Sequence, residues 1–150
     1  MKKTAVGLVF FMAMVALTAG AVLAAAQKVD LVPCPINFPS GTEPPPGGGF
    51  VIFNNPRGTN HNLEVTVSLK AVEPNTSYDI YVFVDGTWFN GAKVGTIKTN
   101  PRGNANFHLN ALLNEGDHVL ALDVTETGST NDVYETPGIH QDQGTLMVFE

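Results

Sequence analysis

Apolar and polar residues alternate one by one through much of the chain after Phe50. The clearest case is residues 63–70, where Leu and Val alternate with Glu, Thr, Ser and Lys. A period of two places the two sets of side chains on opposite faces of a β-strand, so this pattern predicts a half-buried strand. The same alternation recurs at residues 80–84, 105–110 and 118–124, and no segment shows a sustained helical period. We therefore expect an all-β protein.

Turn-forming residues separate these predicted strands. The tetrapeptide Asn-Pro-Arg-Gly at residues 55–58 fits a type I turn, with Gly where φ is positive, and it recurs at residues 100–103. Gly95 lies in a less regular segment and suggests a β-bulge. Roughly eight short strands joined by such turns predict an antiparallel sandwich or barrel. We favour an immunoglobulin-like β-sandwich of about 7–9 short strands.

Three segments carry a resemblance to a known class of domain. YDIYVFVDG, GAKVGTIKTNPRGNANFHL and GDHVLALDV are similar to a recurring strand-turn pattern in small secreted prokaryotic β-sandwich domains. The likeness covers roughly residues 62–124 and consists largely of turn residues. It implies an extracytoplasmic immunoglobulin-like fold and brings no catalytic residues with it. The Pro/Gly-rich segment and the loop that carries Trp88 depart from the shortest version of the pattern.

The first residues have the composition of a secretory signal peptide. Lys2 and Lys3 form a positive n-region, residues 5–17 an apolar h-region, and residues 24–26 a small-residue cleavage site. A transmembrane anchor is the alternative, but no basic stop-transfer flank follows the apolar run. We therefore expect a secreted or extracytoplasmic protein, in the periplasm or at the cell surface, with no membrane span after cleavage.

A short apolar strand at residues 27–32 precedes a segment rich in proline and glycine. Proline removes backbone donors and glycine costs ordering entropy, so this segment predicts a linker or a long surface loop. A strand on such a tether can pair with its own sheet or with that of a neighbouring chain. The expected organisation is a signal peptide at 1–26, an N-terminal strand with its linker at 27–49, and a β-sandwich domain at 50–150.

Charge and cysteine content narrow the classes of partner. The chain has 14 acidic and 8 basic residues and a net charge of −6. Nucleic-acid binding needs clustered Lys and Arg, so it is disfavoured. The single cysteine, Cys34, cannot form an internal disulfide. We expect the Cys34 side chain to pack in the interior as a small apolar group. The alternative is that Cys34 forms an intermolecular disulfide in an oxidising compartment.

The sequence shows no catalytic or strong metal-binding pattern. No serine lies in a G-x-S-x-G elbow, and the histidines lack the H-E-x-x-H spacing. His108 and His118 are weak metal candidates, if their strands pair as a hairpin. Acidic residues between 123 and 142 are possible calcium ligands, but an acidic solvated face is the favoured interpretation. We expect no enzyme activity and no cofactor.

The candidate binding residues are mostly aromatic. Trp88, Phe89 and Asn90 lie in the loop after the strand that carries Tyr81 and Phe83, which face away from the apolar side of that strand. Exposed aromatic rings supply contact area for sugars or proteins, although in small β-domains such rings usually fill the core. We favour a non-enzymatic domain that acts through protein–protein contacts, such as self-assembly or adhesion. The alternative is a carbohydrate-binding module, and a metal-binding domain is less favoured.

Overall fold

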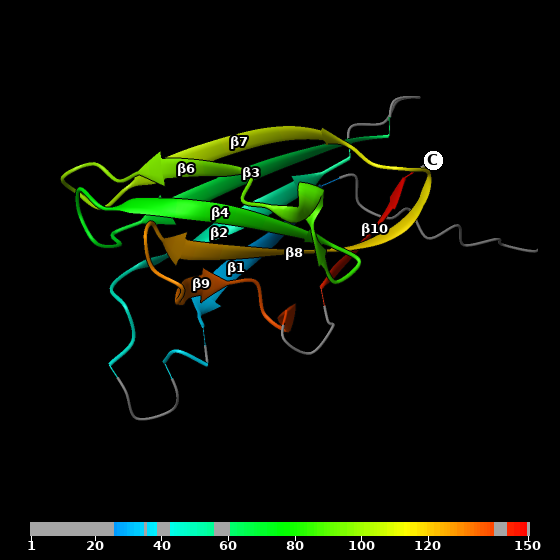
Figure 1. Ribbon diagram of the computed structural model, residues 1–150. Coiled ribbons are helices and arrows are strands. Elements are labelled where there is room, and N and C mark those ends of the chain that lie inside the picture. The colour runs from blue at the N-terminus through cyan, green and yellow to red at the C-terminus, as the bar shows by residue number, and fades with distance from the viewer. Residues whose placement is uncertain (1–25, 35, 39–42, 56–60, 140–143, 150) are drawn as a thin grey trace, which may run out of the picture.

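The computed structural model describes residues 26–34, 36–38, 43–55, 61–139 and 144–149 (Figure 1). Residues 1–25 of the expected signal peptide and most of the predicted turn at residues 55–58 lie outside this part. No helix in the described part is long and apolar enough to cross a lipid bilayer. The elements are β1 (Ala26–Pro33), β2 (Gly48–Asn54), β3 (Asn62–Lys70), β4 (Ser77–Val84), β5 (Thr87–Trp88), a 3-10 helix η1 (Phe89–Gly91), β6 (Gly95–Lys98), β7 (Ala105–Leu112), β8 (Gly116–Glu126), β9 (Asp132–Glu135) and β10 (Thr145–Phe149).

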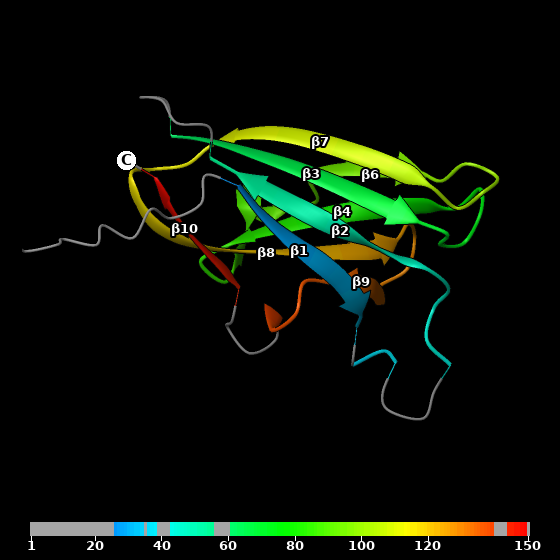
Figure 2. The same cartoon turned by 180° about the vertical axis from the view of Figure 1, so that it is seen from behind.

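The strands form one curled antiparallel sheet, so the all-β prediction is confirmed. Its strands neighbour one another in the order β5-β4-β8-β9-β1-β2-β3-β7, with β6 on β4 and β10 on β8. β1 pairs with β2 along residues 26–31 and with β9 along residues 32–33, which joins the two parts of the sheet (Figure 1 and Figure 2). The strand predicted at residues 27–32 is present, and it has neighbours on both sides.

The curled sheet encloses a continuous apolar core. Leu63, Val65 and Val67 of β3 are fully buried, as the alternation predicted. They belong to one cluster with residues of β4 and β8, which are not neighbours of β3 in the sheet. Burial of apolar surface of this kind stabilises the fold by about 25 cal/mol per Å². The inner faces of the strands therefore supply the core, and the outer faces are left for other roles.

The curl also brings β6 against β7 (Figure 1 and Figure 2). A methyl group at Gly95 in β6 would lie 2.3 Å from Cε2 of Phe107 in β7. Gly95 lies opposite Ile80 in a regular ladder, so the predicted bulge is wrong. This glycine instead permits the close approach of the Phe107 ring.

The turn predicted at residues 100–103 is confirmed. The amide of Gly103 donates to the carbonyl of Asn100 at 2.9 Å, and the Asn100 side-chain oxygen accepts from the amides of Arg102 and Asn104 at 2.8 and 3.1 Å. Gly103 has a φ of 71°, which a residue with a side chain rarely adopts. The turn reverses the chain between β6 and β7.

Candidate ligand-binding groove

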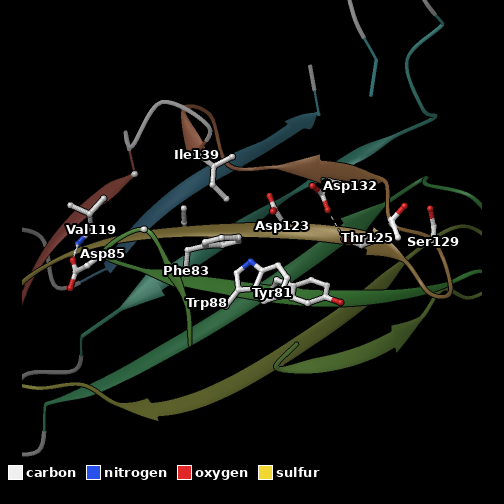
Figure 3. Close-up of a pocket in the computed structure, with 14 residues that line it drawn as sticks. Tyr81, Phe83, Asp85, Trp88, Val119, Asp123, Thr125, Ser129, Asp132 and Ile139 are labelled. Carbon is white, nitrogen blue, oxygen red and sulfur yellow. Dashed lines mark hydrogen bonds between the residues drawn. The ribbon is translucent and has the colours of Figure 1, made fainter. Parts of the chain in front are cut away.

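The candidate site is built on the outer face of β4. Ile80 and Val82 are fully buried in the core. Because side chains alternate along a strand, Tyr81 and Phe83 lie on the opposite face, as predicted. Trp88 of β5 lies directly across from Phe83 in the ladder. Three aromatic side chains from two adjacent strands therefore gather on one surface (Figure 3).

A tight turn returns Trp88 over β4. Asp85 and Gly86 connect Val84 to Thr87, which are paired across the hairpin, and have φ values of 52° and 76°. Two-residue hairpin turns with positive φ at both positions favour Asp-Gly, so the local sequence suits this geometry. The Thr87 hydroxyl donates to the Val84 carbonyl at 3.0 Å. The turn therefore positions the Trp88 indole over β4.

The rings of Tyr81 and Phe83 each contact the ring of Trp88. The centroids of Tyr81 and Trp88 are 5.3 Å apart with an interplanar angle of 42°, and those of Phe83 and Trp88 are 6.2 Å apart at 77°. These separations are typical of favourable aromatic pairs. Trp88 is nevertheless 51% exposed. A large apolar ring is therefore held in place and still open to solvent.

The rings form one side of a groove of about 890 Å³ (Figure 3). Its floor runs along β8 through Ala121, Asp123 and Thr125, and Asp132 and Ile139 line it further along the chain. Tyr81 and Trp88 lie over β4, and the carboxyl groups of Asp123 and Asp132 lie on the other side of β8 (Figure 3). The groove thus has an aromatic side and an acidic side.

The acidic side contains a buried carboxyl group. Asp123 is 5% exposed, and its Oδ1 has no hydrogen-bond partner among the described residues. Burial, followed by the nearby charges of Asp132 and Glu135, raises the pKa of Asp123 to about 8. Asp132 is better solvated and accepts a hydrogen bond from the Thr125 hydroxyl at 2.7 Å. The solvated acidic face predicted for this region is therefore wrong at Asp123 and at Glu135, which is 2% exposed.

The structure brings together some of the predicted binding residues and separates others. Tyr81, Phe83 and Trp88 line the groove. Phe89 packs against the hydrophobic core instead. Asn90 is exposed in η1, with a φ of 56°, and does not line the groove.

The sequence pattern presents the acids of this region only as calcium ligands or as a solvated face. It does not place them in one site with Tyr81, because the face that they share depends on strand pairing. Asp123 lies directly opposite Tyr81 in the ladder of β4 with β8. The local signal at Asp123 is an acidic residue in an apolar alternating segment, where a polar residue marks the outer face of the strand.

The two candidate metal-binding histidines lie on different parts of the sheet. His108 in β7 lies across from Thr66 in β3, and its Nδ1 is 3.1 Å from the Thr66 hydroxyl. His118 in β8 has Nδ1 2.7 Å from Asp85 Oδ2. The hairpin pairing assumed for His108 and His118 is therefore wrong. Within the described residues, no group of three or more His, Cys, Asp or Glu side chains is arranged to hold a metal ion.

Cys34 is a packed interior side chain. It is 0% exposed, and burial is the main cause that raises the pKa of its thiol. The Asn37 amide nitrogen lies 3.7 Å from the Cys34 sulfur and donates to the Asp132 carbonyl at 2.9 Å. An intermolecular disulfide at Cys34 would therefore require this segment to open.

Comparisons of the chain with protein-family models, with curated proteins and with solved structures found no match. The basis for a functional assignment is therefore the chemistry of the groove. Aromatic faces stack on the apolar faces of ring-shaped ligands, and carboxyl groups hydrogen-bond to hydroxyl and amino groups. A concave site with an apolar side and a few polar groups is typical of ligand binding.

Proposed function

We propose that this protein is an extracytoplasmic, non-enzymatic domain that binds carbohydrate in the groove between Trp88 and Asp123. The observation that carries this proposal is the half-exposed Trp88 ring, held 5.3 Å from Tyr81 on the side of a groove of about 890 Å³. A sugar ring has an apolar face that fits an aromatic ring, and hydroxyl groups that fit the carboxyl groups of Asp123 and Asp132.

An immunoglobulin-like β-sandwich is the finer fold that we propose for this domain. It is supported by the core cluster, which joins residues of β2 and β3 with residues of β4 and β8. It is also supported by the two groups of strands that face each other in Figure 1 and Figure 2. The signal-peptide pattern of the first 26 residues supports secretion or display outside the cytoplasm.

Protein–protein contact through an exchanged N-terminal strand is the competing function. It draws support from the Pro/Gly-rich tether after β1. However, β1 already pairs with β2 along residues 26–31 and with β9 at residues 32–33 of its own chain, so strand exchange would have to break these pairings. We therefore place carbohydrate binding first.

The test is a binding screen of the purified protein against soluble β-linked oligosaccharides, followed by calorimetry on the best binder. Trp88→Ala removes the stacking surface, and we expect the affinity to fall at least about tenfold, which corresponds to about 1.4 kcal/mol. Leu112→Ala is the matched control, because Leu112 is 72% exposed on β7, outside the groove. Unchanged affinity in Trp88→Ala, or a screen without any binder, would contradict the proposal.

The non-enzymatic part of the proposal has its own measurement. The bound oligosaccharide is incubated with the protein and then analysed by chromatography. We expect it to be recovered intact. Shortened products would show hydrolysis and would overturn this part, leaving the binding groove in place.

A further inference from the structure

Two aspartates on the outer face of the sheet, Asp79 and Asp123, are both buried but differ in the hydrogen-bond donors around them. Asp79 of β4 is 8% exposed and accepts hydrogen bonds from Lys93, Thr96 and Thr127, at 3.0, 2.5 and 2.9 Å. Burial alone raises the pKa of Asp79, but these donors together hold it below its ordinary value. The fold thus supplies an ammonium and two hydroxyl donors to this buried carboxylate.

Asp123 receives no comparable set of donors. Its Oδ1 is buried without a hydrogen-bond partner among the described residues. Its direct neighbours across the sheet are Tyr81 on β4 and Glu135 on β9, and Asp132 adds a further acid nearby. An unpartnered buried polar atom destabilises the fold, so a ligand that donates a hydrogen bond to it gains a strong contact.

The charge of the groove indicates which donor is missing. Asp85, Asp123 and Asp132 line it, and its described lining residues include no Lys, Arg or His. Asp85 pairs with His118, which lies outside the lining, so Asp123 and Asp132 are the acids without a cationic partner in the described part of the groove. The nearby Lys93 ammonium is already bonded to Asp79. A positively charged donor is therefore the group that the acidic side lacks, and the faces of Trp88 and Tyr81 attract cations as well.

We propose that the groove selects sugars that carry a primary amine, with the ammonium group bonded by Asp123 and Asp132 and the sugar ring stacked on Trp88. This inference rests on the proposed carbohydrate binding and names its ligand class: amino sugars in their charged, non-acetylated form. A neutral sugar makes the same stacking contact but leaves the acidic side without a counter-charge.

Ligand binding then changes the protonation of Asp123. The groups that face it, Tyr81 from β4 and Asp132 and Glu135 from β9, bring no positive charge. Since its pKa is about 8, the carboxyl is mainly protonated in the free protein at about pH 6. An incoming ammonium favours the carboxylate, so binding of the charged sugar releases a proton.

The experiment compares two tetrasaccharides of the same β-1,4 linkage, cellotetraose and the glucosamine tetramer, which differ in carrying a hydroxyl or an amine at C2. Calorimetry at about pH 6, where the amines are charged, is expected to show at least about tenfold tighter binding of the glucosamine tetramer. Asp123→Asn is expected to weaken binding of the glucosamine tetramer more than binding of cellotetraose, and so to reduce this preference to about threefold or less. Asp30→Asn removes an equal charge from a 79% exposed side chain on β1 and is expected to keep the preference.

Proton release separates a direct role of Asp123 from a structural one. Titrations in two buffers of different ionisation enthalpy measure the protons released. We expect release with the glucosamine tetramer in the native protein and none in Asp123→Asn. If Asp123→Asn does not fold, Asp132→Asn takes its place in the selectivity comparison.

The outcomes distinguish the two proposals. Equal affinity of the native protein for the two tetrasaccharides would overturn the amine selectivity and leave carbohydrate binding intact. Binding of neither tetrasaccharide, nor of any sugar in the wider screen, would overturn both. Tighter binding of the glucosamine tetramer that Trp88→Ala does not weaken would place the amine outside the groove and would also overturn the inference.

Discussion

His118 and Asp85 form an ion pair that ties β8 to the turn before Trp88. The His118 Nδ1 lies 2.7 Å from Asp85 Oδ2, and its Nε2 lies 3.0 Å from the Asn114 carbonyl. Both of these neighbours are acceptors, so both ring nitrogens donate only when the imidazole is protonated. Burial lowers the pKa of His118, but the hydrogen bonds to Asp85 and Asn114 outweigh this and raise it above its ordinary value.

This ion pair predicts the pH range in which the turn between β4 and β5 is most stable. The pKa of Asp85 is lowered, first by the hydrogen bond that it accepts from the Val119 amide, so its contribution is lost as pH falls through the lowered value. The pKa of His118 is raised, so its contribution is complete below about pH 6.5 and is lost as pH rises through the folded-state value. We expect the indole signal of Trp88 in NMR spectra to change in step with the His118 titration.

Substitution of the acid tests the same coupling. Asp85→Asn is expected to lower the pKa of His118 and to increase hydrogen exchange at the Thr87 amide. Glu115→Gln is the control, because it removes a charge from a nearby exposed residue that takes no part in the pair. A His118 titration that is the same in Asp85→Asn and in the native protein would rule out the coupling.

Asp123 is expected to make the fold less stable as the pH rises. Its folded-state pKa of about 8 lies above the ordinary value, so the unfolded chain loses its proton first. The stability contribution is therefore complete below about pH 4 and declines up to about pH 8, by at most about 1.4 kcal/mol per pH unit. Asp123→Asn removes this decline, and its melting temperature is expected to exceed that of the native protein by an amount that grows with pH.

Melting curves of both proteins between about pH 4 and pH 8 measure this difference. Asp30→Asn is the control, because the Asp30 side chain is 79% exposed, so we expect its difference from the native protein to stay small across the range. A constant difference between Asp123→Asn and the native protein at all pH values would show that Asp123 keeps an ordinary pKa.

The alternation of residues was enough to predict the core of this fold, but not the chemistry of the groove. Leu63 and Val65 are in the core because one strand determines its own two faces. Tyr81 and Phe83 were placed on the outer face for the same reason. Asp123 became a groove residue only because β8 pairs with β4, and that pairing joins segments far apart in the chain. The wrong prediction for Gly95 has a similar cause, since its neighbour Phe107 belongs to another strand.

Gly95 is expected to tolerate no side chain while Phe107 keeps its position. Gly95→Ala forces a methyl group against the ring and is expected to lower the free energy of unfolding by about 1–3 kcal/mol. In Gly95→Ala combined with Phe107→Ala the clash is absent. The loss of unfolding free energy in this double variant is therefore expected to be smaller than the sum of the losses in the two single variants, by at least about 0.5 kcal/mol. Urea unfolding of the four proteins of this cycle measures the coupling.

Gly48→Ala in β2 is the control for the backbone effect of adding a methyl group. The nearest atom to that methyl would be 3.9 Å away, so no clash arises. We expect Gly48→Ala to change the free energy of unfolding by less than Gly95→Ala does. Additive costs in the Gly95 and Phe107 cycle would contradict the close contact between β6 and β7.

Cys34 is expected to be protected from thiol reagents in the native protein. Its side chain is 0% exposed, and burial raises the pKa of the thiol, which lowers the fraction of the reactive thiolate. Modification followed by absorbance is therefore expected to be slow in buffer and fast in denaturant. For the same reason, light scattering is expected to give the same molar mass with and without reductant.

The segment around Cys34 offers a matched pair of variants. Asn37→Ala removes the amide that donates to the Asp132 carbonyl, so we expect more frequent local opening and faster modification of Cys34. Ile36→Ala changes a neighbouring side chain that is 65% exposed, so we expect the rate to stay unchanged. Rapid modification of the reduced, folded protein, together with a dimer that forms without reductant and that reductant dissociates, would favour the intermolecular disulfide instead. The N-terminal segment would then be a contact between chains, and protein–protein association would take precedence over carbohydrate binding.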